Sequence, residues 1–114
     1  MRGGNMAKEI HCVEEMSEKG FNEFIKPGVV VIDLFAEWCM PCLMMSPIVE
    51  ELCLKMKKIR FGKINIDENS NLSSKFKVLS IPTLIVFKDG REIERLIGSL
   101  PADVLEEKLR KLVK

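Results

Sequence analysis

Two of the four cysteines, Cys39 and Cys42, are separated only by Met40 and Pro41. This spacing lets the second sulfur reach back and close a disulfide bond with the first. In a reducing compartment, cysteines this close together are more often catalytic or metal-binding than structural. The pair therefore suggests thiol–disulfide exchange, in which a thiolate attacks a disulfide and forms a mixed disulfide.

The sequence around the pair places it where a strand gives way to a helix. Residues 29–35 form a nearly continuous β-branched run, which is typical of a central strand covered on both faces. Residues 41–57 have helical periodicity. A cysteine at a helix N-terminus faces unpaired N–H groups and the positive end of the helix dipole, which favour a thiolate. We therefore interpret Cys39 as the exposed nucleophile and Cys42 as the more buried resolving cysteine.

Zinc binding is the alternative chemistry for closely spaced cysteines, and it needs about four nitrogen or sulfur ligands. A second close pair is missing from the sequence, and His11 is the single histidine. We interpret Cys12 and Cys53 as small buried hydrophobic residues, with a regulatory thiol at Cys12 as the alternative. The sequence also lacks a G-x-G-x-x-G loop for flavin or nicotinamide. We therefore expect no metal and no bound cofactor.

The remaining pattern alternates strands with helices in the order β-α-β-α-β-α-β-β-α, which predicts an α/β protein with a mixed sheet. Asp89-Gly90 indicates a two-residue hairpin. The predicted strands cover residues 8–13, 29–35, 59–67, 83–88 and 91–97. The predicted helices cover residues 13–25, 41–57, 69–76 and a last segment that begins at Pro101.

Three methionines crowd the start of the helix at residues 41–57. Met44 and Met45 fall on its apolar stripe, so we expect both in the core. Met40 is expected to be exposed, where its thioether would give a soft and adaptable contact.

The chain resembles the thioredoxin family over residues 8–114. The resemblance rests on residues 31–42, which end in Ala36-Glu37-Trp38-Cys39-Met40-Pro41-Cys42, and on Lys63-Ile64-Asn65-Ile66-Asp67, Ser80-Ile81-Pro82-Thr83, Phe87-Lys88-Asp89-Gly90 and Ile97-Gly98. It implies the thioredoxin fold, a three-layer α/β/α arrangement with about five strands and about four helices. It also implies a protein-disulfide reductase that acts in cell redox homeostasis and electron transport.

The resemblance further implies roles for residues outside the cysteine pair. Asp33 matches a buried acid whose pKa burial would raise, which suits it to move protons to and from Cys42. Lys63 matches a lysine near that acid. The alternatives are that Asp33 only hydrogen-bonds the backbone and that Lys63 is a solvated strand residue. Ile81-Pro82 matches a cis-proline loop that would present the Ile81 backbone to a substrate, and the alternative is an ordinary strand-entry proline.

An apolar patch around Cys39 is expected to bind unfolded or flexible protein segments. Gly98 would permit close backbone approach there, although a glycine at this point could equally mark a bulge. The predicted substrate-binding residues are Trp38, Met40, Pro41, Ile66, Ile81, Pro82 and Gly98.

Three residues depart from the common pattern of the family. The spacer is Met40-Pro41 instead of Gly-Pro, Leu43 replaces a lysine or arginine, and Phe35 stands where tryptophan is common. Less positive charge beside the pair should favour the thiolate slightly less. The departures bear on the redox potential and the choice of reductase, and not on the reaction class.

Composition argues against nucleic acid and membrane partners. The net charge is +1, from 18 basic and 17 acidic side chains, so no field of one sign is available to attract polyanions. No apolar run approaches the roughly 20 residues of a membrane span. Residues 1–7 are interpreted as a flexible leader without the apolar stretch of a secretory signal, followed by one domain over residues 8–114. We therefore expect a cytoplasmic monomer.

The expected partners are protein disulfide substrates and a separate thioredoxin reductase or equivalent electron donor. A glutaredoxin-like reductase that uses a small thiol is a second interpretation, which Trp38 and Asp33 disfavour. A third is a non-enzymatic binding module built on the same fold, which the intact cysteines disfavour.

Overall fold

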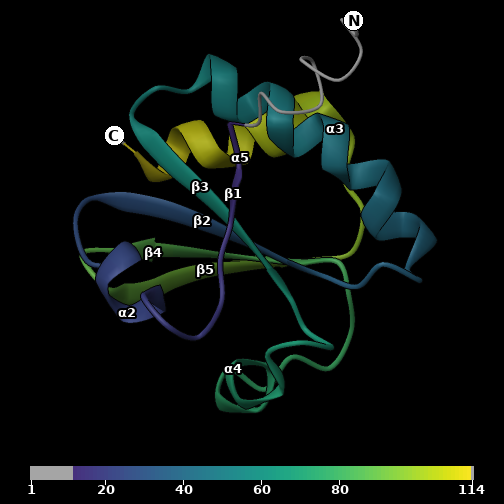
Figure 1. Cartoon of the computed structure of the whole chain (residues 1–114). Helices are drawn as coiled ribbons and strands as arrows, with labels where there is room; N and C mark the ends of the chain where they lie inside the picture. The colour runs from purple at the N-terminus through teal and green to yellow at the C-terminus, as the bar shows by residue number, and fades with distance from the viewer. Residues whose placement is uncertain (1–11, 114) are drawn as a thin grey trace, which may run out of the picture.

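A five-stranded mixed sheet runs through the chain, which the computed structural model describes from residue 12 to residue 113 (Figure 1). The strands are β1 (Glu14–Glu15), β2 (Val29–Phe35), β3 (Ile59–Asn65), β4 (Thr83–Lys88) and β5 (Arg91–Ile97). The helices are α2 (Phe21–Phe24), α3 (Met40–Lys55), α4 (Ser70–Lys75) and α5 (Ala102–Leu112). This arrangement confirms the predicted thioredoxin fold.

The strands lie in the order β1-β3-β2-β4-β5. Strands β1, β3 and β2 are parallel to one another, whereas β4 runs antiparallel to both β2 and β5. Asp89 and Gly90 join β4 to β5 with φ angles of 52° and 88°. A two-residue hairpin turn of this kind needs positive φ at both positions, so the predicted hairpin is confirmed.

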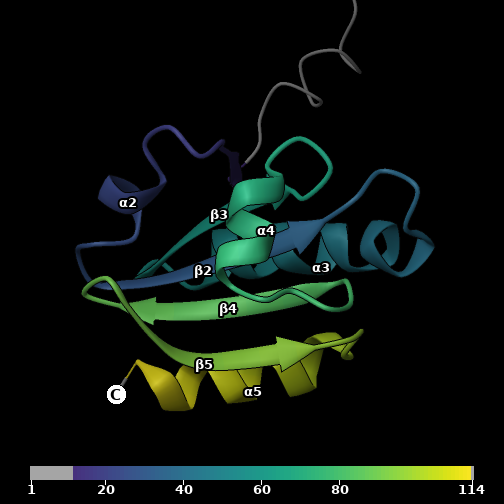
Figure 2. The same cartoon turned by 90° about the horizontal axis from the view of Figure 1, so that it is seen from below.

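Helices cover both faces of the sheet. Figure 1 shows α3 and α5 over one face and α2 and α4 over the other, and Figure 2 shows α4 in front of the strands when the molecule is seen from below. Side chains of β2 alternate between these two layers, as the period of a strand requires. Val31 belongs to the same cluster as Val49 of α3 and Leu105 of α5, whereas Val30 and Ile32 belong to the opposite cluster.

Both edge strands of the sheet have features that disfavour pairing with a further strand. Strand β1 has only two residues, and both glutamates are exposed. At the other edge, β5 exposes Arg91, Glu92 and Glu94 to solvent. Among residues 12–113, no helix is long and apolar enough to cross a membrane.

The first two predicted elements differ from the observed ones. The helix predicted over residues 13–25 is reduced to α2, because Gly20 adopts a left-handed φ of 87° that a helix cannot continue. Met16 instead donates its N–H to the carbonyl of Lys63 at 3.0 Å and extends the edge formed by β1. The strand predicted over residues 8–13 lies mostly outside the described residues, and the observed strand follows it at Glu14.

Candidate active site

The cysteine pair lies where α3 begins, beyond the end of β2 (Figure 1). Cys39 is the N-cap residue of α3 with an extended backbone, and Pro41 occupies the first turn, where its missing N–H leaves no donor unpaired. The Cys42 N–H points at Cys39 Sγ across 3.2 Å. This confirms the predicted position at a helix N-terminus, where such a donor stabilises negative charge on sulfur.

The two sulfurs form a disulfide, with 5.2 Å between the Cα atoms. Cys39 is 5% exposed and Cys42 is 4% exposed, so the expected contrast between an exposed and a buried cysteine is wrong for this oxidised form. The reason is packing, because the bonded pair forms a small cluster with Ala36, and Ile66 and Ile81 pack against it.

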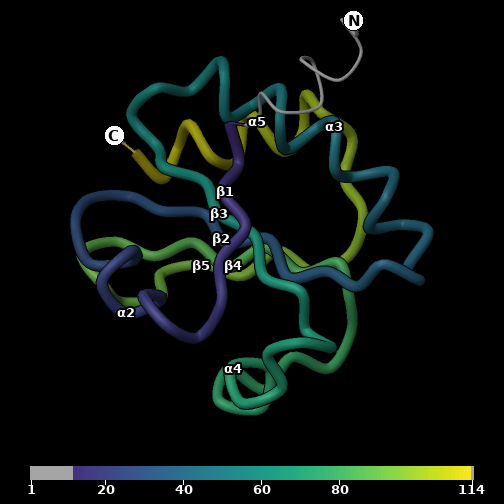
Figure 3. Tube along the Cα trace, viewed as in Figure 1, coloured from purple at the N-terminus to yellow at the C-terminus, as the bar shows by residue number. Residues whose placement is uncertain are grey.

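The loop that leads into β4 lies beside the start of α3, and both segments run along the same end of the sheet (Figure 3). Its Ile81–Pro82 peptide bond is cis. The Pro82 carbonyl accepts a 2.8 Å hydrogen bond from the Gly98 N–H, which ties the loop to the end of β5. Gly98 has a φ of +93°, and a Cβ there would meet nothing within 4 Å. Backbone conformation, not close packing within the chain, therefore explains the glycine.

An apolar groove of about 340 Å³ runs between the cysteine pair and this loop. Its lining includes the predicted residues Trp38, Cys39, Pro41, Ile66 and Ile81. Three further residues were missed by sequence reasoning: Val78, Leu79 and Ser80. Leu79 could have pointed to this part of the groove, because it is an apolar residue in a turn-rich loop and fits neither a helical nor a strand period. Its side chain is 96% exposed.

Further apolar side chains are exposed on the first turns of α3. Met40 is 65% exposed, as predicted, and Leu43 is 52% exposed. Met44 is 67% exposed, so its predicted place in the core is wrong. The apolar stripe of α3 passes through Met45, Val49 and Leu52 instead, which leaves Met44 on the solvent side.

Trp38 is held in place although its side chain is exposed. The indole Nε1–H donates a 2.8 Å hydrogen bond to Asp67 Oδ2. The Asp67 N–H in turn donates to Oδ1 of the buried Asn65 at 2.9 Å. This chain of bonds fixes the ring as one wall of the groove.

Asp33 is buried on the face of the sheet that α3 covers. It is 4% exposed, and its Oδ1 has no hydrogen-bond partner among the described residues. Burial raises the pKa of Asp33 to about 7, and the nearby charge of Lys63 offsets part of that increase. Lys63 is the register partner of Asp33 on β3, and its Nζ lies 5.6 Å from the centre of the Phe35 ring. The predicted buried acid is therefore present, with a lysine beside it.

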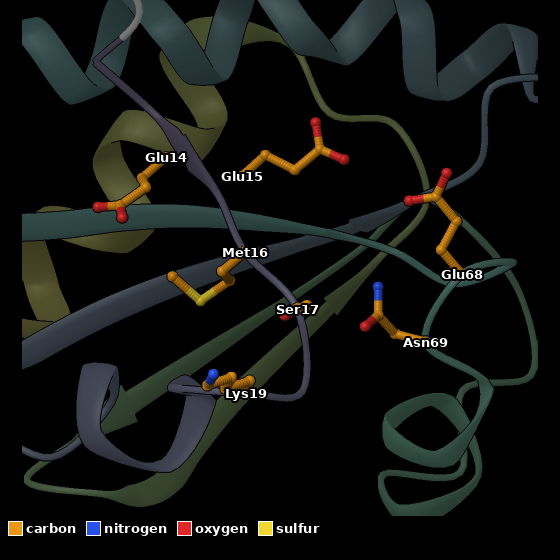
Figure 4. Close-up of a pocket in the computed structure, with 7 residues that line it drawn as sticks. All are labelled: Glu14, Glu15, Met16, Ser17, Lys19, Glu68 and Asn69. Atoms are coloured by element: carbon orange, nitrogen blue, oxygen red, sulfur yellow. The ribbon is translucent and has the colours of Figure 1, made fainter.

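A larger hollow lies elsewhere on the molecule. It measures about 540 Å³ and is lined by residues from β1, the segment after it and the turn before α4, as Figure 4 shows. Its lining is mostly polar and contains no cysteine: Glu14, Glu15, Met16, Ser17, Lys19, Glu68 and Asn69. No group of three or more possible metal ligands occurs within residues 12–113.

The other two cysteines are also paired. Cys12 and Cys53 form a disulfide with 5.9 Å between their Cα atoms, so their interpretation as separate hydrophobic residues is wrong. The bond joins the segment before β1 to the last turn of α3 across 41 positions of sequence. No local spacing rule connects residues so far apart, and the fold alone brings them together.

Comparisons with known proteins agree with this site and fold. The family profile described as Thioredoxin matches residues 12–111. A thioredoxin of Chlamydia pneumoniae is 46% identical over 99 residues, which cover 87% of this chain and 97% of that protein. A thioredoxin of Staphylococcus haemolyticus is 41% identical over 101 residues, covering 88% and 97%. The structure of a mutant thioredoxin from Halobacterium salinarum superposes with a TM-score of 0.80 at 29% identity, covering 92% and 96%.

A three-layer fold with a cysteine pair at a helix N-terminus defines a protein-disulfide oxidoreductase that works by thiol–disulfide exchange. With a matching profile over nearly the whole chain and relatives above 40% identity, this chain belongs to the thioredoxin family.

Proposed function

We propose that the protein reduces disulfides of other proteins, with Cys39 as nucleophile and Cys42 as resolving residue. The observation that carries this assignment is the place of Cys39 at the N-cap of α3. The Cys39 thiolate attacks one sulfur of the substrate disulfide, and the other sulfur leaves as a thiolate. Cys42 then attacks Cys39 Sγ, which releases the reduced substrate and restores the Cys39–Cys42 disulfide.

Asp33 is proposed to handle the proton that Cys42 gives up. A pKa near 7 lets a carboxyl group gain and lose a proton at neutral pH, as a general acid–base catalyst requires. Its Oδ1 has no partner among the described residues of the oxidised form, so it is available to accept a proton. Lys63 is proposed to keep the pKa of this carboxyl group near neutral pH, because its positive charge opposes the increase that burial causes.

The substrate is proposed to lie as an extended segment across the apolar groove. Trp38, Met40, Pro41 and Ile66 would contact its side chains, and the backbone of Ile81 beside Pro82 would align its chain with Cys39. Gly98 supports this placement through its hydrogen bond to Pro82. The surrounding exposed apolar surface suits flexible or unfolded segments better than charged ones.

The electrons are proposed to come from a separate thioredoxin reductase in the cytoplasm. The chain itself would act as a monomer without a bound cofactor, and its own redox group would be the Cys39–Cys42 disulfide. Thioredoxin relatives over most of the chain support this assignment.

Reduction of insulin with dithiothreitol as the electron donor tests the assignment. Cys39→Ser is expected to abolish the acceleration over dithiothreitol alone. Cys42→Ser is expected to accumulate mixed disulfides with insulin, which mass spectrometry of acid-quenched samples would detect. Residual catalysis by Cys39→Ser, or no trapped adduct with Cys42→Ser, would overturn the roles given to the two cysteines.

Glutathione separates this function from that of a glutaredoxin-like reductase. Reduction of the Cys39–Cys42 disulfide by glutathione is expected to be much slower than reduction by a thioredoxin reductase. Equal rates would favour the small-thiol function instead.

A further inference from the structure

The disulfide at the far end of α3 has no part in the proposed cycle. Cys53 lies in the last turn of α3, and Cys12 precedes β1. The fold holds the two residues together through contacts that do not involve sulfur. Glu50 on α3 accepts hydrogen bonds from the backbone N–H groups of Cys12 and Val13, at 3.0 and 3.3 Å. Because the folded chain keeps the two sulfurs near each other, a disulfide between them forms readily and is hard to reduce.

Access to this bond is limited. Cys53 is 6% exposed, whereas Cys12 is half-buried. Both cysteines line one surface hollow, and Cys12 also lines a second one. Cys12 is therefore the more accessible of the two cysteines to an attacking thiolate. The charges near this approach are mixed, since Lys57 and Arg60 line the same hollow as Glu14, and the Glu50 carboxylate bonds the Cys12 backbone. Within residues 12–113, these opposing charges leave no net positive field to attract an anionic attacker.

The catalytic pair of the same chain cannot reach this bond. Cys42 and Cys53 are eleven positions apart on one helix, which at about 1.5 Å per residue separates them by about 16 Å. The helix dipole also acts in opposite directions on the two cysteine pairs. It stabilises a thiolate at Cys39 and disfavours one at Cys53 in the last turn.

We propose that Cys12 and Cys53 form a second redox site, a disulfide harder to reduce than Cys39–Cys42, which stays closed while the catalytic pair cycles and fixes the segment before β1 to α3. The proposal rests on the proposed function only for the identity of the cycling pair. Its oxidant would be a low-molecular-weight disulfide of the glutathione class.

The closing reaction balances with that oxidant. The Cys12 thiolate attacks oxidised glutathione, forms a mixed disulfide and releases one glutathione thiolate. The Cys53 thiolate then attacks Cys12 Sγ, forms the protein disulfide and releases the second glutathione. The protein loses two electrons and two protons, and both are carried away by two molecules of reduced glutathione.

Two matched double variants test the proposal. Cys39→Ser/Cys42→Ser keeps only the second pair, and Cys12→Ser/Cys53→Ser keeps only the catalytic pair. Each full-length variant is equilibrated in dithiothreitol buffers of graded thiol-to-disulfide ratio, quenched, alkylated and weighed by mass spectrometry. The second pair is expected to need at least a tenfold more reducing ratio for half-opening. An equal or less reducing midpoint would overturn the proposal.

A mixing experiment tests the resistance of this bond to the protein's own chemistry. Reduced Cys12→Ser/Cys53→Ser is added in excess to oxidised Cys39→Ser/Cys42→Ser, and the second pair is expected to stay closed. Rapid opening would show that it is an ordinary substrate of the catalytic pair. If either double variant fails to fold, peptide mapping of the wild-type protein during stepwise reduction gives the same order of opening.

Failure of this proposal is distinguishable from failure of the proposed function. If Cys12→Ser/Cys53→Ser reduces insulin normally but Cys12 and Cys53 of the matched variant remain alkylatable in oxidised glutathione, only the second site is wrong. The proposed function is wrong if Cys12→Ser/Cys53→Ser folds and its catalytic disulfide opens normally, but the variant does not reduce insulin. In that case the order in which the two disulfides open still tests the proposal for Cys12 and Cys53.

Discussion

Helix α3 carries one disulfide at each end, and the two ends differ in what surrounds the sulfur. At the N-terminal end, Cys39 and Cys42 close a short loop beside an apolar groove, with a backbone N–H directed at Cys39 Sγ. At the C-terminal end, Cys12 and Cys53 close a loop of 41 positions beside a glutamate that accepts hydrogen bonds from the backbone. The surroundings of the disulfide at the N-terminal end therefore suit repeated opening and closing. Those at the C-terminal end suit a disulfide that stabilises the fold.

The largest expected effect concerns the C-terminal end. Replacing Cys12 and Cys53 with serine should lower the free energy of unfolding by about 4 kcal/mol, because the open chain gains the entropy of a long loop. Urea unfolding under oxidising conditions measures the loss. The matched variant Cys39→Ser/Cys42→Ser opens a much shorter loop and should lose about 2 kcal/mol or less. Equal losses from both variants would remove the distinction between the two ends.

The second effect concerns Asp33, the buried acid of β2 that is proposed to serve Cys42 at the N-terminal end. Burial raises the pKa of Asp33 from 3.8 to about 7, so between these pH values the folded chain binds a proton that the unfolded chain does not. The stability of the protein should therefore fall as pH rises from about 4 to about 7. Asp33→Asn removes this dependence and should stabilise the protein at pH 8.

The expected gain for Asp33→Asn is on the order of 2–3 kcal/mol, less than the full shift would give, because the buried amide also lacks partners. Urea unfolding at several pH values measures it, and the same variant should slow insulin reduction at neutral pH. A stability difference that stays constant from pH 4 to pH 8 would show that Asp33 does not titrate as proposed.

The smallest effect compares one substitution at the two ends of α3. Leu43 follows Cys42 and Leu54 follows Cys53, and the two leucines are 52% and 59% exposed. Leu43→Lys should favour the Cys39 thiolate and speed its alkylation at pH 6 about twofold, a typical effect of one exposed charge. Leu54→Lys carries the same charge and should leave the rate unchanged. Similar rates in both variants would show that local charge does not tune the site.

Local patterns in the sequence were sufficient to predict the parts of the site that depend on neighbouring residues. The run at residues 29–35, the N-cap at Cys39 and the hairpin at Asp89-Gly90 are each set by adjacent side chains or backbone angles. The burial of Asp33 was predicted from the resemblance to the thioredoxin family, and its place within the apolar run agrees with that prediction.

Other features depend on how distant segments meet, and sequence patterns do not contain that information. Cys12 reaches Cys53 only because β1 pairs with β3 next to α3. Leu79 lines the groove because the loop before β4 lies beside the helix start. The helix predicted from Val13 failed because Val13 and Met16 are apolar residues that pack against the sheet, and Gly20 interrupts the chain before α2.

The guarded edges of the sheet have a consequence for behaviour in a crowded solution. A protein that is proposed to bind extended, partly unfolded segments risks having such segments join its own sheet as extra strands. The two-residue β1 with its exposed glutamates and the charged outer strand β5 leave little room for such addition. Unfolded segments are therefore expected to bind in the groove, and aggregation through the edges of the sheet is disfavoured.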